Sequence, residues 1–187
     1  MKNNLLKAGR TMSEVSLRPL SLTDTNSIVR WRNSPSVKKN LYTQSELTPE
    51  QHIQYFNNVV LTGKCSQFII EIDTVYGKKS IGTIFLKNID LYNRCGEYGI
   101  FIGDDQERGK GYAKLATKQI LRYGFEKLHL HRVYLTVMAD NYPAIRAYEN
   151  AGFIREGIER EAYLRGEEYV DIVYMAILEE EWKKQNL

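Results

Sequence analysis

The chain has 187 residues, of which 43% are hydrophobic and 26% charged, with a formal net charge of +3. These values are typical of one soluble globular domain, and the charge is too small to indicate nucleic acid or a membrane surface as a partner. No apolar run is long enough to span a membrane, and the N-terminus lacks the apolar core of a secretory signal. Cys65 and Cys95 indicate two buried or partly buried thiols rather than a disulfide framework or a metal site. We therefore predict a cytoplasmic protein.

The chain is predicted to form one domain over residues 14–182. Residues 1–13 look like a loose, flexible extension. The closing stretch from Glu179 is polar apart from Trp182 and indicates a frayed end, with residues 183–187 as the tail.

Helices are predicted in the N-terminal third, after a first strand that Pro19 ends. A capping signal begins a helix over residues 24–32, and a short helix-like piece is expected over 37–42. Thr48 and Gln51 form a capping box at the start of another helix, which runs to about residue 60.

Beyond residue 64 the hydrophobic period changes from helical to alternating. Strands are predicted over residues 67–72, 80–89, 96–102, 133–137, 153–163 and 167–178, and helices over 111–127 and 142–151. This order predicts an α/β fold with a mixed, mostly antiparallel sheet and one βαβ unit.

A glycine motif, Gln106-Glu107-Arg108-Gly109-Lys110-Gly111-Tyr112-Ala113, connects a predicted strand to a predicted helix. Glycines at a helix start let backbone N–H groups approach a ligand, and the helix N-terminus favours negative charge. The motif lacks the third glycine of a dinucleotide fingerprint and the Lys-Ser/Thr of a P-loop. By itself it predicts an anion site only weakly.

A second motif, Asn141 to Phe153 (NYPAIRAYENAGF), follows about 30 residues later. In this order and spacing the two motifs resemble the GCN5-related N-acetyltransferase (GNAT) superfamily, over about residues 15–178. The resemblance implies acetyl-CoA as cosubstrate and no metal. It also implies a sheet of about seven strands, splayed between strands 4 and 5 and flanked by helices.

The resemblance implies a cofactor site as well. Backbone N–H groups over residues 108–112 would hold the pyrophosphate, and pantetheine would pair with β-backbone near residues 100–102, as an extra strand does. Asn141 would contact the pantetheine arm. The predicted cofactor-binding residues are Ile100, Phe101, Ile102, Gln106, Glu107, Arg108, Gly109, Lys110, Gly111, Tyr112, Ala113, Asn141, Ala144, Arg146 and Tyr148.

The implied reaction is direct transfer of the acetyl group to an amine. Tyr148 is predicted to protonate the leaving thiolate, and the alternative is a core tyrosine. Glu97 is the candidate base, directly or through water, and the alternative is a sheet carboxylate bonded to a neighbour such as Arg94. His52 is a further candidate base, whereas the other two histidines indicate a loop or helix-end pair.

The acceptor stays open between several amines. Residues 30–39 and 47–52 resemble acetyltransferases of nucleotide-linked amino sugars. Residues 146–149 and 161–171 also resemble ribosomal-protein and spermidine acetyltransferases. The positively charged side chains that could bind a diphosphate are Arg30, Arg32, Lys38 and Lys39. The carboxylates that the early segment offers a polyamine are Asp24, Glu46 and Glu50.

Two further alternatives concern function and assembly. Thirteen tyrosines indicate either an amphipathic core and rim or a pocket lined by phenols. A non-catalytic acyl-CoA-binding module is the alternative of another class, although Tyr148 and Glu97 together favour an enzyme. A homodimer through the C-terminal strands is expected from the resemblance.

Overall fold

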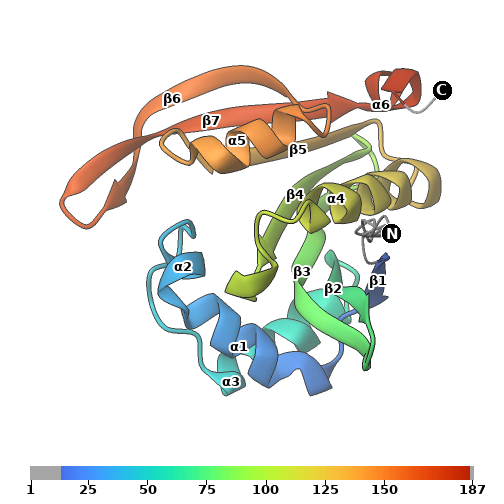
Figure 1. Ribbon diagram of the computed structural model, residues 1–187. Coiled ribbons are helices and arrows are strands. Elements are labelled where there is room, and N and C mark those ends of the chain that lie inside the picture. The colour runs from blue at the N-terminus through green and yellow to red at the C-terminus, as the bar shows by residue number, and fades with distance from the viewer. Residues whose placement is uncertain (1–13, 186–187) are drawn as a thin grey trace, which may run out of the picture.

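A computed structural model describes residues 14–185, which build one seven-stranded sheet with helices on both faces (Figure 1). The spatial order is β1-β2-β3-β4-β5-β7-β6, with all neighbours antiparallel except β4 and β5. This confirms the mixed, mostly antiparallel sheet. The strands are β1 Val15–Pro19, β2 Cys65–Thr74, β3 Gly77–Asp90, β4 Cys95–Ile102, β5 Arg132–Met138, β6 Ile154–Arg165 and β7 Glu168–Leu178.

The helices begin at capping signals that the sequence carries. Thr48 accepts a hydrogen bond from the Gln51 backbone N–H at 3.3 Å, which confirms the predicted capping box. The N-terminal helices are η1 Leu22–Asp24, α1 Thr25–Asn33, α2 Pro35–Lys38, α3 Pro49–Tyr55 and its π-helical continuation η2 Phe56–Val60. The later helices are η3 Asp105–Glu107, α4 Tyr112–Arg122 with its continuation η4 Tyr123–Lys127, α5 Tyr142–Glu149 and α6 Glu179–Gln185.

Two expectations about helices were wrong. The short helical piece is α2, which begins at Pro35 rather than near residue 37, because proline is favoured at a first helical position. The chain end from Glu179 to Gln185 is helical rather than frayed. Trp182 anchors it, since its ring is only 9% exposed and lies 5.3 Å from the Phe125 ring. The predicted extension, residues 1–13, and residues 186–187 lie outside the described part of the chain.

The two faces of the sheet pack against different helices. On one face, Ile84 and Leu86 belong to the large core that includes Ile120 of α4. On the opposite face, Ile69 packs with Trp31 and Phe56 from the N-terminal helices. Each such fully buried side chain stabilises the fold by about 1.5–3 kcal/mol, so both helical layers are held firmly against the sheet.

β4 and β5 pair over only three positions, from Cys95↔Arg132 to Glu97↔Tyr134. Beyond these, β4 continues beside β3 to Ile102, and β5 continues beside β7 to Met138. Figure 1 shows the outcome, with β5 remaining beside β7 while β4 follows β3. The predicted splay between strands 4 and 5 is confirmed, and it leaves unpaired backbone edges on both strands.

Candidate active site

A cleft of about 890 Å³ opens where β4 and β5 separate. One wall is the end of β4, the other is the end of β5, and the glycine loop, α5 and the N-terminal helices complete the lining. This volume lies in the range of small-molecule sites. The divergence of the two strands therefore brings the two sequence motifs and the N-terminal helices to one site.

The glycine loop forms a cradle at the start of α4. Gly109 and Gly111 have φ angles of 71° and 87°, which favour glycine. The predicted range, 108–112, was wrong at its start, because the Arg108 N–H donates to the Asp105 carbonyl at 3.4 Å. The backbone N–H groups of residues 109–113 donate no hydrogen bond to the described residues, and no atom lies within 4 Å of a Cβ position built on Gly109. Free N–H groups at the N-terminus of an eleven-residue helix, open to the cleft, fit a pyrophosphate.

Side chains brace this cradle from behind. The Arg108 guanidinium donates to the Ile102 carbonyl at 2.9 and 2.7 Å, which ties the loop to the end of β4. Glu107 is buried between Lys110 at 2.8 Å and Lys79 at 2.9 Å, and these two ammonium groups lower its pKa. Its negative charge is thereby compensated beside an anion site.

Most of the predicted cofactor-binding residues meet at the cleft. Gln106, Lys110 and Arg146 do not line it. Lys110 is ion-paired with Glu107, and Gln106 and Arg146 are exposed. Asn141 accepts from the Ala144 N–H at 3.4 Å and caps α5. The predicted residues that line the cleft are Ile100, Phe101, Ile102, Glu107, Arg108, Gly109, Gly111, Tyr112, Ala113, Asn141, Ala144 and Tyr148.

Tyr148 projects from α5 into the cleft, and its ring packs on Tyr98 and Phe153 with centroids 5.7 and 6.0 Å away. Its hydroxyl forms no hydrogen bond within the described chain. Burial raises the pKa of Tyr148 to about 12, with Tyr42 acting in the same direction. The hydroxyl therefore carries a proton at neutral pH and has a free direction in which to donate it.

Glu97 lies on β4 at the last position paired with β5, and it also lines the cleft. Its carboxylate bonds to Lys87 at 3.0 Å and accepts from Asn88 at 2.8 Å. The partner suggested from the sequence, Arg94, was wrong. Arg94 donates to the His129 carbonyl and to Glu179, since a positive φ of 53° at Arg94 turns the chain there.

Tyr42, which was not predicted as a site residue, lines the cleft from the loop after α2. Its ring meets the Tyr163 ring edge-on at 5.3 Å, and the Tyr163 hydroxyl donates to the Tyr42 carbonyl at 2.7 Å. Burial raises the pKa of Tyr42, while the Thr136 side chain on β5 opposes the shift. The high tyrosine count was the signal for such a phenol-lined wall.

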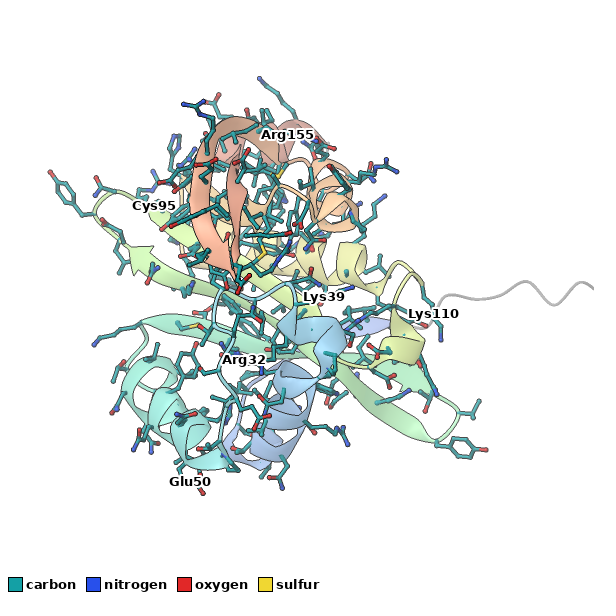
Figure 2. All side chains as sticks on the ribbon, turned by 90° about the vertical axis from the view of Figure 1, so that its left-hand side faces the viewer. Arg32, Lys39, Glu50, Cys95, Lys110 and Arg155 are labelled. Carbon is teal, nitrogen blue, oxygen red and sulfur yellow. The ribbon has the colours of Figure 1, made fainter. Side chains whose placement is uncertain are left out.

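The predicted acceptor residues separate into two groups. Arg32 lines the cleft, whereas Arg30, Lys38 and Lys39 do not. The four positively charged side chains therefore do not form a diphosphate-binding cluster there. In Figure 2, Arg32 lies toward the centre of the molecule and Glu50 points outward beyond α3.

The three early carboxylates also lie away from the cleft lining. Asp24 is ion-paired with Arg18 at 2.8 Å, and Glu46 and Glu50 are exposed. Within residues 14–185, no group of three His, Cys, Asp or Glu side chains could hold a metal ion. No helix of that region is long and apolar enough to cross a membrane.

A sheet split between two parallel strands, with an anion cradle at one end of the cleft and a protonated phenol in its wall, defines an acetyl-CoA-dependent N-acetyltransferase. The sequence profile of the Acetyltransferase (GNAT) domain matches residues 14–154, and the chain belongs to this family.

Relatives and solved structures agree with this assignment. The chain is 27% identical to spermidine N(1)-acetyltransferase of Vibrio cholerae over 91% of its own length and 96% of that protein. It is 35% identical to the putative ribosomal N-acetyltransferase YdaF of Bacillus subtilis over 61% of its own length, and spans 62% of that relative. The crystal structure of the Vibrio cholerae spermidine N-acetyltransferase with CoA and spermine superposes with a TM-score of 0.84 at 26% identity, covering 90% of this chain and 98% of that one.

Proposed function

We propose that the enzyme moves an acetyl group directly to a small primary amine, with Tyr148 as the acid and Glu97 as the base. The observation that carries this proposal is the convergence of three features on one cleft: the N–H cradle, the Tyr148 hydroxyl and the Glu97 carboxylate. Acetyl-CoA, the cosubstrate, supplies the acetyl group activated as a thioester.

Different residues along the cleft bind different parts of acetyl-CoA. The N–H groups of residues 109–113 hold the pyrophosphate at the start of α4. The unpaired edge of β4 near Ile100 and Phe101 offers backbone groups to the pantetheine amides, as an edge strand offers them to a peptide. In this arrangement the thioester end lies between β4 and β5, in the cleft that Tyr148 of α5 also lines.

The two proposed catalytic side chains handle a proton in opposite directions. Tyr148 Oη holds its proton at neutral pH because burial raises its pKa to about 12. The protonated hydroxyl is therefore present to donate to the sulfur as the thiolate leaves. Glu97 has one oxygen bonded to Lys87 and the other to Asn88. Further lone pairs on both oxygens can take the amine proton, directly or through one water.

Two acceptor classes have support from different observations. Similarity over nearly the whole chain to a spermidine N(1)-acetyltransferase favours a polyamine. The Arg32 side chain in the cleft favours an amine that also carries negative charge, as in the nucleotide-linked amino sugars expected from the sequence. A protein N-terminus remains a third candidate through the similarity to YdaF.

The test is thiol release from acetyl-CoA with one amine at a time: spermidine, a nucleotide-linked 4-amino sugar, a ribosomal N-terminal peptide and an aminoglycoside. We expect saturable, amine-dependent release with one class. Acetyl-CoA binding without release for every amine would overturn the proposal and favour a binding module.

The assembly of the enzyme is a separate proposal. Strand β6 lies at the sheet edge and exposes Ile154 and Ile158 at 53% and 60%. An exposed apolar edge strand favours self-association, so we propose the homodimer expected from the resemblance, with sedimentation as its test.

A further inference from the structure

One part of the cleft lining, here called the acceptor chamber, consists of Arg32, His52, Tyr55, Gln67 and Phe85. It lies on the same sheet face as Glu97. The register pairs Gly99 of β4 with Phe85 of β3, and Phe85 with Gln67 of β2. Two strand spacings, about 10 Å, therefore separate β4 from Gln67.

Two buried atoms of this chamber have no partner. Among the described residues, the buried side-chain atoms that lack a hydrogen bond are His52 Nε2 and Gln67 Oε1. Their residues are only 2% and 8% exposed. Buried polar atoms without a partner cost about 1–3 kcal/mol each, so two of them at one cavity wall indicate that something else binds there.

The hydrogen bonds around Gln67 determine which kind of ligand group its side chain can bind. Its Nε2 donates to the Thr83 hydroxyl at 3.0 Å, and that hydroxyl donates its single proton to the Phe68 carbonyl at 2.8 Å. The amide orientation is therefore determined, and Oε1 is the free end. A ligand must bring a donor, either a hydroxyl or an N–H group, to this oxygen.

His52 is a neutral ring with one free nitrogen. Its Nδ1 bonds to the Thr25 hydroxyl at 3.0 Å. Burial lowers the pKa of His52; the Arg32 guanidinium acts in the same direction and the Asp24 carboxylate in the opposite one. When Thr25 donates to Nδ1, Nε2 carries the proton and can donate to a ligand oxygen.

Arg32 supplies the positive charge of the chamber. It is half-buried, and no carboxylate of the described chain forms an ion pair with it, whereas the nearby Lys87 is paired with Glu97. Burial lowers the pKa of Arg32, and the Tyr55 hydroxyl opposes this shift. An arginine remains charged in proteins, and a half-buried guanidinium without an anion is costly.

We infer that the acceptor chamber recognises an amine whose far end carries a carboxylate or phosphate next to a hydroxyl or N–H donor. The anionic oxygens would bind Arg32 and His52 Nε2, the donor would bind Gln67 Oε1, and the amine would reach toward Glu97, two strands across the sheet from Gln67. This inference rests on the proposed function and names the substrate class. A polyamine would instead bring an ammonium beside Arg32, where like charges repel.

The test is calorimetric binding to the CoA-loaded enzyme of amines that differ in charge. The pairs are 6-aminohexanoate against 1-aminohexane and glucosamine 6-phosphate against glucosamine, with spermidine as the cation. We expect the anionic member of at least one pair to bind about tenfold or more tightly, the effect of a charge-assisted hydrogen bond. The two pairs distinguish carboxylate from phosphate.

Variants locate that preference. Arg32→Gln should abolish it, and Arg32→Lys should retain part of it if the first variant folds poorly. Arg122 is an exposed arginine in the last turn of α4 and lies outside the cleft. Arg122→Gln is therefore the control and should leave the preference for the anionic amine intact. Gln67→Leu should weaken the binding of glucosamine 6-phosphate, which has hydroxyl groups to donate to Gln67 Oε1. The binding of 6-aminohexanoate, which has no such hydroxyl, should be unaffected.

Several results would overturn the inference. These are equal binding within both pairs, tighter binding of spermidine, or a preference that survives Arg32→Gln. Thiol release with the same amines separates this failure from that of the proposed function. Thiol release with spermidine alone would support acetyl transfer and refute the anion site. An Arg32-dependent binding preference without any thiol release would support the anion site and refute acetyl transfer.

Discussion

The Tyr148 ring meets the Tyr98 ring edge-on, with centroids 5.7 Å apart and planes at 84°. Tyr98 is fixed in turn, because it is 3% exposed and its hydroxyl is hydrogen-bonded to Thr117 of α4 at 2.8 Å. The buried core thus holds the Tyr148 hydroxyl at the opening between β4 and β5. A fixed, protonated phenol at this position is the basis of the acid role proposed for it.

Removing the hydroxyl of Tyr148 tests that role. Tyr148→Phe keeps the ring packing, so acetyl-CoA affinity should be unchanged, while kcat should fall about 10²–10⁴-fold through loss of the proton donor. Thiol release and calorimetry measure the two quantities. Tyr142→Phe, at an exposed tyrosine of the same helix, is the matched control and should behave as wild type. Equal kcat in the two variants would assign Tyr148 to packing alone.

Neutralising Glu97 should affect the rate according to pH. Glu97→Gln should lower kcat/KM about 10²-fold at neutral pH, where most of the amine is protonated and needs a base. The deficit should shrink at alkaline pH, where the amine loses its proton to solvent. Glu156→Gln, at a carboxylate paired with Arg132 outside the cleft, is the control. A deficit independent of pH would point to the ion pair with Lys87 as the sole role of Glu97.

The glycine loop can be tested with two equally strained alanines. Gly109 and Gly63 have φ angles of 71° and 77°, and neither has an atom within 4 Å of a built Cβ. Each alanine should cost about 1–2 kcal/mol of unfolding free energy. Only Gly109→Ala places a methyl group in the cradle, so it alone should weaken acetyl-CoA binding, by about tenfold or more. Parallel losses of affinity would refute the cradle.

Two glycines of the sheet should respond differently to alanine. A Cβ on Gly82 would lie 2.3 Å from the Phe101 carbonyl oxygen, a rigid backbone atom, so Gly82→Ala should cost about 3 kcal/mol or more. A Cβ on Gly99 would lie 2.3 Å from the tip of the Phe85 ring, which can swing into the cleft. Gly99→Ala should therefore raise the acceptor KM more than it lowers the melting temperature. The opposite ranking in melting scans would contradict this packing.

His52 should make stability fall in mild acid. Burial lowers its pKa below the ordinary 6.5, so the unfolded chain binds the proton more readily. Its contribution is therefore complete above pH 6.5 and is lost as the pH falls below that value. Urea unfolding at about pH 7.5 and 5.5 should show a smaller loss for His52→Gln than for wild type. Identical losses would mean that His52 does not titrate differently on folding.

Local signals in the sequence predicted much of the fold. The Thr48 capping box and the alternation of strands such as 96–102 depend on neighbours within a few residues, and both were confirmed. The family resemblance added the splay between strands 4 and 5. The helix at the chain end was missed because Trp182 is held by Phe125, more than 50 residues away.

The site was predicted less completely, because its partners depend on strand register. Glu97 was singled out, but its partner Lys87 lies opposite on β3, which only the β3–β4 register reveals. The unpaired atom of Gln67 also depends on register, whereas that of His52 depends on how α3 packs, and neither can be predicted from neighbours in the sequence. A polar residue inside a strand, such as Gln67, is the signal that could have pointed to the chamber.

Direct transfer of the acetyl group from acetyl-CoA to the amine is tested best by the stoichiometry of one reaction. The enzyme is mixed with acetyl-CoA, then with its preferred amine, while free thiol, N-acetylated amine and intact protein mass are followed. Direct transfer predicts no thiol release before the amine is added, equal amounts of thiol and acetylated amine afterwards, and an unchanged protein mass throughout. An acetylated protein formed before the amine arrives, or acetyl-CoA bound with neither product formed, would contradict it.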